Sequence, residues 1–85
     1  LSSARITRRS GNTSIDIMVV NERETLDKIE SALRNHWDYQ ASNKFLMEYK
    51  LIIIDSVGNE KAFPFSKAQF GGYGRTPGVI IDLVS

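Results

Sequence analysis

Alternating apolar and polar positions mark two strands near the start of the chain. Residues Ala4 to Arg9 form a short, mostly polar stretch with the character of a sheet edge. Residues Ser14 to Val20 alternate more strictly, which predicts that one face of this strand is buried. The Gly11-Asn12 pair between them is typical of a two-residue hairpin turn. In the second strand Ile15, Ile17 and Val19 share one face, and Asp16, Met18 and Val20 share the other.

A helix is predicted from Glu22 to Asn35. Apolar residues recur there at intervals of three and four, as they do in an amphipathic helix. Asn21 is a suitable N-cap, and Glu24 three residues later completes a capping box. We expect Leu26, Ile29 and Leu33 to face the sheet, and we expect ion pairs between Glu24 and Lys28 and between Glu30 and Arg34.

Three further strands are predicted after the helix. The first runs from Leu46 to Asp55, and the Gly58-Asn59 pair marks a hairpin turn behind it. Glu60 to Phe65 should pair back at an edge of the sheet, because Pro64 cannot donate a hydrogen bond to a neighbouring strand. Val79 to Val84 is apolar enough to form a last, central strand.

These elements predict a single small α+β domain over residues 1–85, in the order β-β-α-β-β-β. One helix packs on a five-stranded antiparallel or mixed sheet. Two hairpins that flank one helix are similar to a β-grasp arrangement, in which the last strand would lie parallel beside the first. Such a similarity concerns the fold alone and carries no function with it.

The composition argues against catalysis and against metal binding. The chain has no cysteine and one histidine, so the preferred ligands of zinc and a cysteine nucleophile are missing. We expect His36 to be a residue favoured by the dipole at the helix end, since no context brings a serine and a carboxylate to it. The oxygen-rich stretch 55–60 lacks the ligand spacing of a calcium loop and reads as a turn. We therefore expect no enzymatic activity, no catalytic residue, no cofactor and no metal.

The sequence contains little that indicates a membrane segment or a cellular compartment. The longest apolar run, Leu51 to Ile54, is far shorter than the roughly 20 residues of a membrane-spanning helix, and no signal peptide is visible. We expect no membrane partner. The absence of cysteine slightly favours the cytosol without fixing the compartment. The chain opens at Leu1 rather than at methionine, as a processed form or a fragment would.

Charge is spread unevenly along the chain, although the net charge is only +1. Residues 1–13 carry a net charge of +3, residues 14–60 carry −4 and residues 61–85 carry +2. A total this close to zero does not favour a polyanionic partner, but it leaves both ends of the chain basic.

The stretch FGGYGRTPG, residues 70–78, combines four glycines with an aromatic and a cationic side chain. Phosphate-binding glycine loops lead from a strand into a helix, whereas this stretch is expected to lead into a strand, so no nucleotide site is predicted. Two interpretations remain. The stretch is either a hinge between two strands or an exposed loop that presents Tyr73 and Arg75 to a partner.

The sequence favours a small protein–protein interaction module that binds its partner through a sheet edge and the loop 70–78. The alternative is a nucleic-acid-binding domain that uses the basic N-terminal strand together with the aromatic and cationic residues of the loop. Self-association through a sheet edge and binding of a small ligand are further alternatives. The residues expected to contact the partner are Tyr73, Arg75, Arg5, Arg8 and Arg9.

Overall fold

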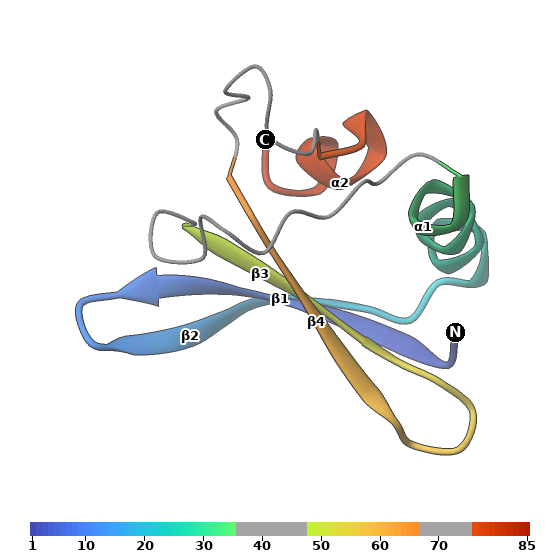
Figure 1. Cartoon of the computed structure of the whole chain (residues 1–85), viewed down its shortest axis with the longest axis horizontal. Helices are drawn as coiled ribbons and strands as arrows, with labels where there is room; N and C mark the ends of the chain where they lie inside the picture. The colour runs from blue at the N-terminus through green and yellow to red at the C-terminus, as the bar shows by residue number, and fades with distance from the viewer. Residues whose placement is uncertain (36–47, 67–75) are drawn as a thin grey trace.

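The fold is built on an antiparallel sheet of four strands. The computed structural model describes residues 1–35, 48–66 and 76–85. The strands follow the order β2-β1-β3-β4 across the sheet, and each neighbouring pair is antiparallel (Figure 1). The elements are β1 (Ser3–Ser10), β2 (Thr13–Val20), α1 (Arg23–Asn35), β3 (Tyr49–Ile54), β4 (Glu60–Phe65) and α2 (Gly78–Leu83).

Both predicted hairpin turns are present. Ser10 pairs with Thr13, which leaves Gly11 and Asn12 as a two-residue turn between β1 and β2. Gly11 has a φ of 61°, and a positive φ at the first turn residue is what a type II′ turn requires. Gly58 has a φ of 91° in the turn between β3 and β4. Glycine adopts these angles without the steric penalty that a Cβ atom would bring.

Helix α1 confirms the amphipathic pattern in the sequence. It starts at Arg23, one residue later than predicted, and its described residues extend to Asn35. Both predicted ion pairs form on its exposed side, with nitrogen–oxygen distances of 3.6 Å for Lys28–Glu24 and 3.7 Å for Arg34–Glu30. Pairs of this kind add only a few tenths of a kcal/mol each, roughly 0.3–0.5. The position of α1 therefore depends on its apolar face.

The core lies on one face of the sheet, under both helices (Figure 1). Leu26 and Ile29 from α1 and Ile80 from α2 are fully buried there. The strand residues of the core lie on that same face, because side chains paired across neighbouring strands point to the same side of the sheet. The buried strand residues are Ala4, Ile6, Val20, Tyr49, Leu51 and Phe65. No described element covers the opposite face.

The prediction of a fifth strand at residues 79–84 is wrong. Residues Gly78–Leu83 form the short helix α2 instead. Its first turn is closed by hydrogen bonds from the backbone N–H groups of Ile80 and Ile81 to the carbonyl oxygen of Pro77, at 3.0 and 3.2 Å. The described residues therefore form an α+β unit with a four-stranded sheet and two helices.

The pattern of burial in the apolar run at the end of the chain is that of a helix. Ile80 is fully buried, while Val79, Leu83 and Val84 are half-buried against the same core. Residues that are three or four positions apart lie on one side of a helix, as these residues do. The polar Asp82 interrupts the apolar run between them. A short apolar run does not distinguish a strand from a helix by itself, and packing in the fold overrides β propensity here.

Strand β1 is an interior strand and not a sheet edge. It pairs with β2 on one side and with β3 on the other, and both pairings are antiparallel. The β-grasp-like arrangement, with a final strand parallel to β1, is thus not found in the part of the chain that the structure describes. On the uncovered face of this interior strand Arg9 is exposed, Arg5 is half-buried and Thr7 is buried.

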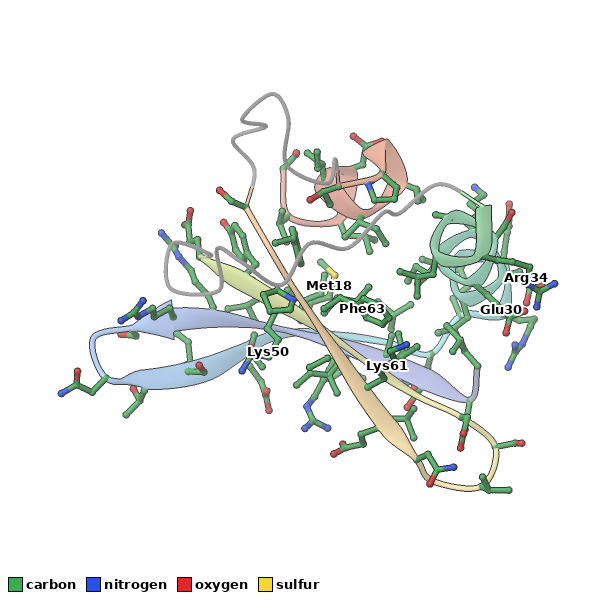
Figure 2. All side chains as sticks on the ribbon, viewed as in Figure 1. Met18, Glu30, Arg34, Lys50, Lys61 and Phe63 are labelled. Atoms are coloured by element: carbon green, nitrogen blue, oxygen red, sulfur yellow. The ribbon has the colours of Figure 1, made fainter. Side chains whose placement is uncertain are left out.

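The alternation in β2 predicted one buried face without saying which residues form it. Val20 is buried and Met18 is half-buried on the side of the helices (Figure 2), opposite Ala4 and Ile6 of β1. A bulge follows, because Ile6 pairs with Met18 whereas Thr7 pairs with Asp16, so β2 contains one residue without a partner. The alternating set Ile15, Ile17 and Val19 is exposed, at 51%, 41% and 63% of the maximal area.

Within the described residues, neither helix has the length and apolar character needed to cross a membrane.

The burial along α1 generates a prediction about stability. Leu26 is fully buried, whereas Leu33 is only half-buried although it belongs to the same apolar stripe. We expect Leu26→Ala to lower the free energy of unfolding by about 2–5 kcal/mol. Leu33→Ala should cost less, about 1–2 kcal/mol, because water already reaches part of the side chain. Urea unfolding of both variants measures the difference, and equal losses would show that Leu33 is as well covered as Leu26.

Candidate functional site

The five residues predicted to contact a partner are only partly placed by the structure. Tyr73 and Arg75 lie outside the described residues, so the prediction that they form the tip of a binding loop stays a prediction. Arg5, Arg8 and Arg9 all belong to β1. Side chains alternate between the two faces of a strand, so Arg5 and Arg8, three positions apart, point to opposite faces.

Arg5 lies on the uncovered face and spans the sheet. Its Nη1 donates to Oε1 of Glu60 on β4 at 3.1 Å, and its Nε is 3.8 Å from Oδ1 of Asp16 on β2. The guanidinium thus links the two edge strands across β3 and β1. Its side chain is 33% exposed, so solvent screens these pairs only in part. Both of its nearby partners are acids of the same sheet.

Arg8 lies on the face that carries the core, at the end of the sheet near β3. Its guanidinium carbon is 6.0 Å from the centre of the Tyr49 ring, directly across the strand pair. Its Nη2 is 3.0 Å from Oε1 of Glu48. The Tyr49 ring in turn stacks on the Phe65 ring, with centroids 5.3 Å apart. Arg8 therefore caps an aromatic pair at the border of the core.

Arg9 returns to the uncovered face beside the first hairpin turn. Its Nε donates to the carbonyl oxygen of Gly11 at 3.4 Å. The structure thus brings Arg5 and Arg9 to one face of β1 and places Arg8 on the other. The basic segment at the start of the chain does not form one continuous cationic surface within the described residues.

The described end of the loop 70–78 differs from expectation. Thr76 is buried, and Pro77 immediately precedes α2. The loop therefore leads into a helix and not into the strand that the sequence predicted. Helix α2 has only six residues, too few for a substantial helix dipole, and it offers no independent sign of an anion.

A different surface emerges from the structure, which we call the β2 edge: the outer side of β2 with Ile15, Ile17 and Val19. Among the described residues no strand pairs with the outer side of β2, and β2 is eight residues long. An unpaired edge presents a row of backbone N–H and C=O groups. The only charged residue of the strand is Asp16, which lies close to Arg5.

The opposite edge of the sheet is better protected. Strand β4 contains Pro64, which has no N–H to offer, and it begins with the charged pair Glu60 and Lys61. Proline and charge are the devices by which proteins prevent an edge strand from pairing with other chains. The sequence correctly placed Pro64 at an edge, but it gave no sign that β2 forms the other edge. The alternation in β2 predicts one buried face, but it does not say which residues stay exposed.

The oxygen-rich turn after β3 uses its own carboxylate internally. Oδ1 of Asp55 accepts hydrogen bonds from the backbone N–H groups of Val57 at 3.0 Å and Asn59 at 2.9 Å, and the Asn59 side chain donates to Oδ2 at 3.2 Å. The Asn59 N–H group is the main cause that lowers the pKa of the Asp55 carboxyl, while partial burial opposes the shift. The carboxylate therefore closes the turn.

Side chains that could hold a metal do not gather in the described part of the chain. No group of three or more histidine, aspartate or glutamate residues comes together there.

No protein family matches the chain, and no curated protein or solved structure is significantly similar to it.

The Asp55 turn predicts a specific dependence of stability on pH. A carboxyl whose pKa is lower in the folded state stabilises the fold above its ordinary value of 3.8, and this contribution is lost as the pH falls through the folded pKa. We expect Asp55→Asn, which keeps an acceptor oxygen but removes the charge, to lack this component. Urea midpoints measured between about pH 5 and pH 2 test it. An identical pH profile for both proteins would assign the effect to other carboxyls.

Proposed function

We propose that this domain is a protein-interaction module that accepts an extended segment of a partner as an additional strand along β2. The observation that carries the proposal is the β2 edge. It combines unpaired backbone groups with three exposed apolar side chains. The strand at the opposite edge, β4, has a proline and charged residues instead. In strand addition the backbone supplies affinity, and alternate side chains of the added strand supply specificity.

The chemistry of the β2 edge supports a protein partner. Ile15, Ile17 and Val19 are three of the four large apolar residues that are exposed within the described chain. An unprotected edge strand is a risk for aggregation unless something covers it. A partner strand would satisfy the outward N–H and C=O groups and remove these side chains from water, at roughly 25 cal/mol per Å² of apolar area.

The bulge in β2 determines how such a partner would pair. The extra residue of the bulge lies opposite the step from Ile6 to Thr7 in β1 and interrupts the regular pairing there. The bulge also increases the local twist of β2. A partner segment therefore pairs regularly on one side of the bulge at a time. We expect a short segment of about four to six residues rather than a strand of full length.

The nucleic-acid alternative draws less support from the described residues. Arg5 and Arg8 face opposite sides of the sheet, and each lies beside a carboxylate of the same domain. Phosphate contacts would have to displace those carboxylates. If binding to single-stranded oligonucleotides nevertheless used Arg5, Arg8, Arg9 and Arg75, affinity would fall with salt with a log–log slope near −3. A slope this steep would favour the alternative over the β2 edge.

The proposal is tested with a charge placed on the β2 edge. Peptides about ten residues long are selected from a random library against the intact protein, and their affinity is measured by calorimetry. Ile17→Lys should weaken binding about tenfold or more, because a charge replaces an exposed apolar contact. Val57→Lys is the matched control, since Val57 is 78% exposed in the turn between β3 and β4. It should leave binding unchanged.

Two further readouts decide where the peptides bind and whether the natural partner is a second copy. Amide exchange should slow at the outward N–H groups of β2 when a peptide binds. Peptides that bind equally well to Ile17→Lys, or that protect amides elsewhere, would overturn the proposal. Sedimentation of the protein alone should show a monomer. Association that Ile17→Lys abolishes would keep the β2 edge as the binding surface and identify a second copy as its partner.

A further inference from the structure

A groove with apolar walls lies between α1 and the β4 side of the sheet. We call it the α1/β4 groove. Its volume is about 480 Å³, within the range of small-molecule sites. Leu33 from α1, Ile53 from β3 and Phe63 from β4 form the walls, and all three are only half-buried although they belong to the core. The helix thus leaves one margin of the core open.

Charged side chains stand at the rim of the groove. Figure 2 shows Lys61 and Phe63 on the sheet side, with Glu30 and Arg34 across from them on α1. Arg34 Nη2 lies 3.7 Å from Oε2 of Glu30. The pKa of the Glu30 carboxyl is lowered, first by a hydrogen bond from the Leu1 amino group and, to a smaller extent, by the charge of Arg34. The carboxylate of Glu30 is therefore ionised and already engaged.

Lys61 differs from the other rim residues. It pairs with Ile53 in the sheet, so it points to the side of the helices rather than to the uncovered face. Its ammonium nitrogen lies 5.2 Å from the centre of the Phe63 ring. No carboxylate of the described residues forms an ion pair with it. The groove thus combines apolar walls with one cation that has no anionic partner in the described chain.

We propose that the α1/β4 groove binds a small amphipathic carboxylate, with the aliphatic tail against Leu33, Ile53 and Phe63 and the carboxylate at Lys61. The tail would cover apolar surface that the helix leaves in contact with water. The head would supply the negative charge that Lys61 lacks. This site lies by β4, at the other end of the sheet from the β2 edge, so the two proposals do not depend on one another.

The test uses three probes that share one tail and differ in the head: decanoate, decanol and decyltrimethylammonium. Each is titrated below its micelle concentration into the intact protein and followed by amide NMR. Decanoate should bind with the highest affinity and shift the amides of Leu33, Ile53 and Phe63. Decanol should bind more weakly, and the cationic probe should bind least, because Lys61 repels it.

Matched lysine variants separate the head contact from the tail contact. Lys61→Gln should weaken decanoate binding about threefold, as expected for an exposed ion pair, and should leave decanol unchanged. Lys50→Gln is the control. Lys50 also lacks an ion pair among the described residues, but it pairs with Pro64 and points to the uncovered face (Figure 2). It should leave all three affinities unchanged.

A third variant tests the walls without touching the charge. Leu33→Phe should fill part of the groove and weaken all three probes together while the protein stays folded. The proposal is overturned if no probe binds saturably or if the shifted amides lie elsewhere. It is also overturned if decyltrimethylammonium binds as tightly as decanoate, or if Lys50→Gln weakens decanoate as much as Lys61→Gln does.

Discussion

The burial of a single face of the sheet is the constraint on which the remaining structure depends. Leu26, Ile29 and Ile80 supply the helical half of the core, and all three pack on the same side of the strands. Nothing among the described elements covers the other side, so residues there must tolerate water. Arg5 meets this requirement by linking acids on the two edge strands. The polar character of β1, an interior strand, follows from this one-sided core.

The same constraint determines where surfaces for binding remain. Among the described residues, the two helices leave part of the sheet uncovered. One such surface is the β2 edge, where Ile15, Ile17 and Val19 are exposed. The other is the space beside α1, where Leu33 and Phe63 are half-covered. The first surface offers backbone hydrogen bonds, as a polypeptide partner requires, whereas the second is concave and carries Lys61, which has no ion pair among the described residues.

Local signals in the sequence were sufficient for the hairpins and α1 but not for the arrangement of strands. Gly11 and Gly58 identified the turns, and Pro64 identified an edge, because each acts through the backbone of its own neighbourhood. The conformation of residues 78–83 and the position of β1 depend on contacts with distant residues, and neither propensity nor periodicity contains that information. For the candidate site, the sequence predicted that the arginines of β1 contact a partner, but in the fold these arginines lie on two opposite faces of the sheet. The prediction overlooked the exposed residues of β2, because the bulge places Ile15 across from Arg8 and Val19 across from Arg5, on opposite faces, and the alternation in the sequence does not reveal a bulge.

The ladder between β1 and β3 has a consequence for the order of folding. The two hairpins pair residues that are close in sequence, and isolated hairpins form within about 1–10 μs. The ladder between β1 and β3 joins residues 3–8 to residues 49–54, about 45 positions away, and it lies at the centre of the sheet. Closing so large a loop costs chain entropy before any packing compensates for it. We therefore expect the meeting of the two hairpins, rather than the formation of either one, to set the folding rate of this domain.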